Sequence, residues 1–189
     1  MAAPLESESA GYLLPRHEGA WTIQDVLALP EDRTQRVELV DGALVVSPRG
    51  ALLHQVLAFE LGATLKAACP AGLRATAEID VEMPAGNWLI PDFTVIRDVG
   101  FPAGLFPAEH VVLAGEVVSP SSRRRDRTLK RQLYAEARIP FYLVVDLGEE
   151  PVSAVLLELD GDGYREVVRS EAGKLLLDRP FPVTLELTV

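Results

Sequence analysis

Cysteine and histidine are scarce in this sequence of 189 residues. The single cysteine, Cys69, excludes an intramolecular disulfide framework and a cysteine-based zinc site, and so little cysteine is typical of a reducing compartment. We therefore expect a cytoplasmic protein. The three histidines, His17, His54 and His110, show no His-x-x-x-His spacing, so the helical motif of many zinc hydrolases is absent.

Long apolar runs are also missing. No stretch approaches the roughly 18 apolar residues that a membrane-spanning helix needs, so we expect no membrane association. The first twenty residues lack the basic and apolar regions of a signal peptide and show no hydrophobic periodicity. We predict a flexible arm over residues 1–20 and a single domain over residues 21–189, in a chain whose 48% hydrophobic content can supply a sizeable core.

Positive charge is in short supply, with 18 Lys and Arg against 28 Asp and Glu and a net charge of −10. This balance argues against a protein that coats nucleic acid non-specifically. Six cations nevertheless cluster between Arg123 and Arg131, at the predicted start of a helix, where they oppose the helix dipole. Their placement favours an anionic partner, although a solvated first turn is the simpler alternative. A local patch can act on phosphates because salt confines charge effects to about 8–10 Å.

Hydrophobic periodicity predicts an α/β domain with a mixed sheet. The sequence alternates on both sides of Asp41-Gly42, a dipeptide that favours a type I′ turn, so we expect a β-hairpin over 36–47. Residues 110–119 are apolar on both faces, as in a central strand. The other expected elements are helices over 21–29, 51–68 and 122–137, strands over 75–83, 88–98 and 141–147, and a β-meander after Pro151.

Three polar residues converge on one possible site. Asp92 follows Pro91, which removes one ladder hydrogen bond and marks a sheet edge or a bulge. Glu116 lies where the central strand gives way to a Ser-Pro turn. Lys130 shares a helix face with Asp126 and can approach both carboxylates if the helix packs across the sheet. Two acids and a lysine suit metal-assisted phosphodiester hydrolysis, because Mg²⁺ takes one or two carboxylates and a lysine offsets developing charge.

Each of these residues also has an ordinary structural explanation. An aspartate after a proline is most often a turn or cap residue, and a glutamate at a strand end usually lies on a solvated rim. Asp126 and Lys130 are by default a surface ion pair that contributes about 0.3–0.5 kcal/mol. Spacing alone therefore leaves both explanations open. If the site is a nuclease, we expect the substrate backbone to be bound by Arg123, Arg124, Arg125, Arg127 and Arg131.

Several motifs are specific when they are taken together. They are "VELVDGALVVSP", a helix opening with His54, "LIPDFTVIRD" and "EVVSPSSRRRDRTLKRQLYAEARIPFYLVVD". Within them stand Pro91-Asp92, Glu116-x-x-Ser119-Pro120-Ser121, Asp126, Lys130, Tyr134, and Ile139-Pro140-x-Tyr142 leading into Asp146. This combination resembles the Uma2 family of endonucleases, formerly a domain of unknown function, within the PD-(D/E)xK nuclease superfamily. The similarity covers about residues 21–189.

The resemblance implies a restriction-endonuclease-like core, in which helices flank a mixed central sheet, here with an N-terminal β-hairpin and a C-terminal β-meander. Asp92 then matches the motif aspartate and Glu116 the motif acid, both as ligands of Mg²⁺, with Mn²⁺ as an alternative. The chain departs from the superfamily at Val118, where a lysine normally stands two residues after the motif acid. Lys130 on the following helix is the matching candidate, so its role is the assignment that departs most from the pattern.

The resemblance also suggests accessory residues and partners. Glu38 matches a glutamate frequent in the family, and a solvent-facing strand residue is equally compatible with its position. His54 shares a helix face with Leu57, which favours a partly buried structural histidine over a role in the active site. Asp126 is a further accessory candidate, and Tyr134 is predicted to pack in the core. The implied partner is nucleic acid, with DNA expected, and the superfamily suggests a homodimer.

Three functions remain in view. The first is a metal-dependent endonuclease that uses Asp92 and Glu116 as metal ligands and Lys130 to orient water or to offset charge. The second is a catalytically inactive nuclease-fold binding or scaffold protein, which the acidic balance and the displaced lysine favour. The third is a hydrolase of nucleotides or other small phosphates, which the size of its pocket would distinguish from a nuclease.

Overall fold

The structure, a computed structural model, describes residues 15–30, 35–48, 50–100, 102, 104–119 and 125–188, with only the backbone of residues 125–127. Its strands are Gln35–Val40 (β1), Ala43–Pro48 (β2), Leu73–Ala77 (β3), Val81–Glu82 (β4), Trp88–Leu89 (β5), Phe93–Arg97 (β6), Phe106–Pro107 (β7), Val111–Val118 (β8), Phe141–Asp146 (β9), Ser153–Asp160 (β10), Gly163–Arg169 (β11), Lys174–Leu177 (β12) and Val183–Glu186 (β13). Its helices are Ile23–Leu27 (α1), Leu52–Ala68 (α2) and Arg131–Glu136 (α3), with 3-10 turns at Pro84–Gly86 (η1) and Ala108–His110 (η2) and a π-helical segment at Arg125–Lys130 (η3). Within the described ranges, none of the helices has the length and apolar character needed to cross a membrane.

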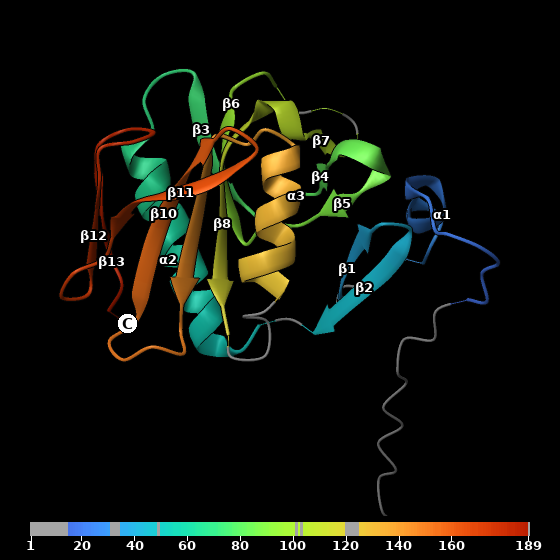
Figure 1. Cartoon of the computed structure of the whole chain (residues 1–189), viewed down its shortest axis with the longest axis horizontal. Helices are drawn as coiled ribbons and strands as arrows, with labels where there is room; N and C mark the ends of the chain where they lie inside the picture. The colour runs from blue at the N-terminus through green and yellow to red at the C-terminus, as the bar shows by residue number, and fades with distance from the viewer. Residues whose placement is uncertain are drawn as a thin grey trace, which may run out of the picture.

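The strands form three sheets (Figure 1). The largest has six strands in the order β11-β10-β9-β8-β6-β3, and the next has five in the order β2-β1-β5-β4-β7. The predicted C-terminal meander is divided, because β10 and β11 extend the six-stranded sheet whereas β12 and β13 pair with each other. This mixed α/β architecture confirms the fold class predicted from the sequence.

The predicted N-terminal hairpin is confirmed as β1 and β2. Asp41 and Gly42 have φ angles of 49° and 74°, the left-handed values that a type I′ turn requires. Before the hairpin, the Thr22 side chain accepts a hydrogen bond from the Asp25 backbone N–H, and the Asp25 carboxylate accepts one from the Thr22 backbone N–H. This capping box begins α1 inside the helix predicted over 21–29. Of the predicted arm, residues 1–14 lie outside the described residues.

Strand β8 is the central strand of the site. All eight of its residues are buried, as its apolar sequence predicts. It pairs in parallel with β9, where Glu116 is opposite Val144, and antiparallel with β6, where Gly115 is opposite Phe93. Parallel neighbours need a crossover connection, and here that connection contains η3 and α3. The crossover places the helix back across the sheet, which the sequence prediction for Lys130 required.

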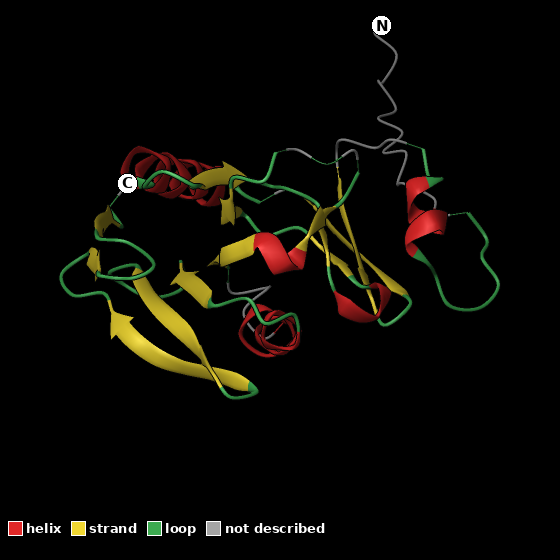
Figure 2. Cartoon of the chain, turned by 90° about the horizontal axis from the view of Figure 1, so that it is seen from above, coloured by secondary structure: helices red, strands yellow, loops and turns green. Residues whose placement is uncertain are grey.

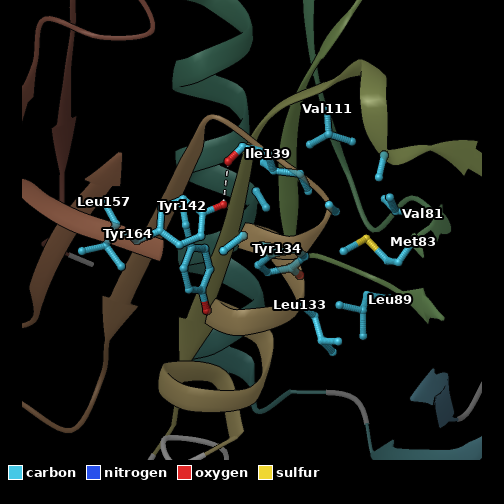
Figure 3. Close-up of a cluster of buried hydrophobic side chains, with 14 of the residues drawn as sticks. Val81, Met83, Leu89, Val111, Leu133, Tyr134, Ile139, Tyr142, Leu157 and Tyr164 are labelled. Carbon is cyan, nitrogen blue, oxygen red and sulfur yellow. Dashed lines mark hydrogen bonds between the residues drawn. The ribbon is translucent and has the colours of Figure 1, made fainter. Parts of the chain in front are cut away.

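Helices α2 and α3 cover opposite faces of the six-stranded sheet (Figure 1 and Figure 2). The core under α3 contains Ala114 and Val118 of β8 together with Tyr134. Strands β4 and β5 of the five-stranded sheet contribute to the same core (Figure 3). The core on the other face lies between the sheet, α2 and the β12–β13 pair, and includes Val117. Since Glu116 alternates with Val117 and lies between Ala114 and Val118, its side chain faces α3.

Two of the passages of the chain between the two larger sheets differ from the sequence prediction. The single strand predicted over 75–83 is wrong: β3 ends at Ala77, Glu78 has a left-handed φ of 46°, and β4 belongs to the other sheet. The strand predicted over 88–98 is likewise two strands, β5 and β6, which belong to different sheets. Pro91 lies between them, where its missing N–H costs no ladder hydrogen bond. Alternation of apolar residues describes each short strand but cannot indicate the sheet in which it pairs.

Gly115 has no side chain, which leaves room for the ring of Phe93 at the start of β6. A Cβ atom on Gly115 would lie 2.0 Å from Cε2 of the fully buried Phe93, the residue after Asp92. We expect Gly115→Ala to lower the free energy of unfolding by about 1–3 kcal/mol, because the ring must leave a packed position. In denaturant unfolding, Gly163→Ala is the control, since its added Cβ would have no neighbour within 4 Å. Equal stability of the two variants would show that the ring is free to move.

Candidate active site

Three buried carboxylates come from three separate strands. Glu38 of β1, Asp92 just before β6 and Glu116 of β8 are each 1–2% exposed. The Lys130 Nζ atom lies 2.9 Å from Glu38 Oε1 and 2.8 Å from Glu116 Oε1. Asp92 Oδ2 accepts a hydrogen bond of 2.7 Å from the backbone N–H of Val117, the residue after Glu116. The predicted amine therefore lies beside Glu116, and the Asp92 carboxylate contacts the backbone next to Glu116.

Lys130 is the last residue of η3 and is itself buried. Transferring an ammonium group and a carboxylate out of water costs several kcal/mol for each ion, so such groups need close partners. Burial alone would raise the pKa of Glu38, but the charges of Lys130 and Arg36 and a hydrogen bond of 3.0 Å from the Ile90 backbone N–H together lower it. Glu38 is therefore a buried, ionised partner of the amine and not the solvent-facing residue that its strand position also allowed.

Asp92 is held by contacts to its side chain and its backbone. Its backbone N–H donates to the Gly115 carbonyl at 3.0 Å, which fixes it against β8. Arg36 Nη1 donates to Oδ1 at 2.7 Å, and His54 Nε2 lies 3.1 Å from Oδ2. Burial alone would raise the pKa of Asp92, but the hydrogen bond from His54 and the charge of Arg36 hold it well below its usual range. In return, the hydrogen bond to Asp92 raises the pKa of His54.

Tyr134 joins the site to the core under α3. Its hydroxyl donates to Glu116 Oε1 at 2.6 Å, so this oxygen receives both the tyrosine and Lys130. Its ring is fully buried and packs edge-on against Tyr142, with 5.1 Å between ring centroids (Figure 3). Burial and the neighbouring Glu116 charge raise its pKa well above the usual value, so Tyr134 is a neutral donor. The core role predicted for Tyr134 is correct, and its hydroxyl adds a contact to the site.

Asp92 is reached from the surface through a cavity of about 190 Å³. The residues that line it include Gly50, His54, Gln55, Phe59, Glu78 and Asp92. Helix α2 supplies His54, Gln55 and Phe59, and the segment after β3 supplies Glu78. The passage between sheets at Glu78 therefore forms one wall of the approach to Asp92.

The structure brings together five of the residues that the sequence singled out, namely Glu38, His54, Asp92, Glu116 and Lys130. His54 is partly buried, as predicted, and contacts Asp92 directly, so a structural role and a role at the site both remain predictions. Arg131 donates to the Tyr164 backbone carbonyl in β11. The candidates Arg123 and Arg124, and the side chains of Arg125, Asp126 and Arg127, lie outside the described residues.

Sequence reasoning missed Arg36. It stands two residues before Glu38 in β1, and residues at this spacing point to the same face of a strand. Once Glu38 is taken as a site residue, this alternation is the signal that could have found Arg36. Arg36 pairs with Asp92, which lies 56 positions later in the sequence. This contact depends on how the five-stranded sheet packs on the six-stranded one.

Residues 23–189 match the family model of Uma2, described as "Putative restriction endonuclease". The chain belongs to the Uma2 family. A solved structure, described as a putative nuclease belonging to DUF820 from Anabaena variabilis ATCC 29413, is similar in fold with a TM-score of 0.66. The match covers 84% of this chain and 89% of that chain at 16% identity, so it bears on the fold alone. No curated protein matches this Uma2 chain.

The Uma2 family description supports a nuclease-like function, and restriction-endonuclease-like proteins generally use divalent metals. Among the described residues, no group of three or more His, Cys, Asp or Glu side chains could hold a metal ion. Mg²⁺, however, usually takes only one or two protein carboxylates, and water and substrate phosphate complete its shell. Asp92, just before β6, and Glu116, on the neighbouring strand β8, are hard oxygen donors, so the chemistry of these two residues fits a hard divalent ion.

Proposed function

We propose that this Uma2 protein is a metal-dependent endonuclease that hydrolyses phosphodiester bonds of nucleic acid, with DNA as the expected substrate. The observation that carries the proposal is the buried chain Glu38–Lys130–Glu116 next to Asp92. Replacing a buried ion network by apolar residues is often neutral or stabilising. A fold with no chemical use for four buried charges therefore has little reason to keep them.

Asp92 and Glu116 are the proposed ligands of Mg²⁺ or Mn²⁺. A divalent ion bound there supplies Lewis acidity to the phosphoryl group and lowers the pKa of water. Lys130 lies next to Glu116 and can offset negative charge that develops on the phosphoryl oxygens. Tyr134 donates to the same Glu116 oxygen and so fixes the orientation of this carboxylate.

His54 and Arg36 act through Asp92. Both donate to its carboxylate, one to each oxygen, and both keep it ionised at neutral pH. His54 also lines the cavity through which a substrate reaches Asp92. The arginines at 123, 124, 125, 127 and 131 are proposed to bind the substrate backbone, with Asp126 as an accessory residue. We also expect a cytoplasmic homodimer, and light scattering tests the oligomeric state.

The His54 ring can occupy its position beside Asp92 because Gly50 has no side chain. A Cβ atom there would lie 2.4 Å from His54 Nδ1, so Gly50→Ala must turn the imidazole away from its contact with Asp92. We expect kcat/KM for cleavage to fall by about 10- to 100-fold, the range seen when a partner that orients a metal ligand is lost. Thermal unfolding should change little, and Gly163→Ala should change neither quantity. Full activity of Gly50→Ala would remove His54 from the mechanism.

The specific observation that favours an inactive scaffold is that basic side chains already pair with all three carboxylates. Such a network can hold a fold together with no further ligand. The two functions differ in their response to a divalent ion, because a ligand that binds the native state raises its stability by mass action.

The deciding experiment is thermal unfolding with increasing Mn²⁺, together with cleavage of plasmid and oligonucleotide substrates. We expect Mn²⁺ to raise the midpoint of the wild type, with a stabilisation of about 2.7 kcal/mol at one hundred times the dissociation constant. Glu116→Gln should abolish this rise. Glu186→Gln is the matched control, because Glu186 pairs with a lysine at the same 2.8 Å on the surface. A flat response of the wild type and no cleavage of any substrate would favour the scaffold.

A further inference from the structure

Phe59 exposes a large aromatic surface at the entrance to the candidate active site. It is 73% exposed on α2, although Leu57, Ala58 and Leu61 around it are buried in the core. Its side chain lines the same cavity as Asp92. A single exposed apolar side chain is ordinary on a protein surface, so the feature that points to a ligand is the position of this ring on the lining of the cavity that contains Asp92.

Phe59 lines the same cavity as two other residues of α2, His54 and Gln55. Gln55 and Phe59 are four residues apart and share one face of α2, and His54, next to Gln55, lies 3.1 Å from Asp92. Phe59 is five positions after His54, which corresponds to about 7.5 Å along the helix axis. The ring is thus within the same recess as the acid but on its outer side.

The depth of Asp92 limits which nucleic acids can reach it. Asp92 and Glu116 are each 2% exposed, and Asp92 is reached through a cavity of about 190 Å³. A stacked, paired nucleotide cannot enter such a recess unless it leaves the duplex, which costs a few kcal/mol, whereas an unpaired nucleotide avoids most of this cost. The net charge of −10 also disfavours the more densely charged duplex relative to a single strand.

We propose that Phe59 is a stacking platform for one unpaired base and that the preferred substrate is single-stranded or locally unpaired nucleic acid. The proposal rests on the proposed function in placing the substrate phosphate at Asp92. An aromatic side chain stacks on any base, because every base offers a π-face, so the platform confers little sequence preference.

The test measures binding and cleavage of a fluorescent oligodeoxynucleotide, single-stranded or annealed to its complement. Binding is followed by anisotropy in Ca²⁺ and cleavage in Mn²⁺. We expect Phe59→Ala to weaken single-strand binding and raise KM by roughly tenfold or more, with kcat nearly unchanged. Phe59→Trp should restore binding and Phe59→Leu should not. Leu176→Ala, on the exposed strand β12, is the control and should behave as the wild type.

Each other outcome also decides the matter. Tighter binding of the duplex, or equal rescue by leucine and tryptophan, overturns the stacking role. A change of oligomeric state in Phe59→Ala, seen by light scattering, would mean that the ring contacts a second copy of the chain, and this also overturns it. Single-strand binding that depends on Phe59 without any cleavage would leave this inference standing while the proposed endonuclease activity fails. If Phe59→Ala cleaves with the KM of the wild type, the proposed endonuclease activity stands and the stacking role of Phe59 fails.

Discussion

Lys130→Met should abolish nucleic-acid cleavage and lower the free energy of unfolding by about 3–5 kcal/mol. Methionine fills much of the same volume, but it leaves Glu38 and Glu116 buried with no cation between them. The Lys130 Nζ atom lies within 2.9 Å of a carboxylate oxygen from each, and all three side chains are nearly inaccessible to water. The loss of stability reports the two buried carboxylates that are left without a cation. The loss of activity reports the missing positive charge beside the phosphoryl oxygens.

Two further variants separate the stability effect from the chemical one. Glu38→Gln and Glu116→Gln combined with Lys130→Met remove all three charges, so stability in denaturant should return toward the wild-type value while activity stays lost. Lys174→Met is the surface control: Lys174 Nζ lies 2.8 Å from Glu186 Oε1, but both side chains are half exposed. It should change stability by about 0–1 kcal/mol. A Lys130→Met protein as stable as the wild type would contradict the buried pairing.

The sequence predicts well those elements whose signal is local. The Asp41-Gly42 turn and the central strand β8, apolar except for Glu116, are each specified within a few residues, and the structure contains both. The acids Asp92 and Glu116 could be selected because each stands where a regular strand pattern is interrupted, by Pro91 in one case and by the Ser-Pro turn in the other.

The missed features depend on contacts between distant segments. Residues 75–83 alternate regularly, yet the chain changes sheets at Glu78, because pairing partners lie elsewhere in the sequence. Arg36 reaches Asp92 only when the five-stranded sheet packs on the six-stranded one, and no short-range pattern carries that information. The helix face of His54 predicts a partly buried residue but carries no information on its contact with Asp92. The resemblance to Uma2 pointed to both acids and to Lys130 but not to Arg36, which pairs with Asp92.

Asp92→Asn should reduce cleavage by at least about a hundredfold and remove the stabilisation by Mn²⁺. The substitution conserves shape but replaces one charged oxygen by an amide NH₂ group. Asp92 accepts from Arg36 Nη1 through Oδ1 and from the Val117 N–H and His54 through Oδ2. Either orientation of the asparagine sets NH₂ against at least one of these donors, so a further loss of about 1–3 kcal/mol in stability is expected.

Asp80→Asn is the matched control for this substitution. Asp80 lies at the crossing from β3 to β4 and accepts one hydrogen bond of 3.0 Å from Trp88 Nε1, which an asparagine oxygen can also accept. It should therefore retain activity, stability and the response to Mn²⁺. Cleavage by Asp92→Asn within a few-fold of the wild type, in protein shown to be folded by thermal unfolding, would exclude Asp92 as a metal ligand. The acid would then serve only to hold Arg36 and His54 between the two sheets.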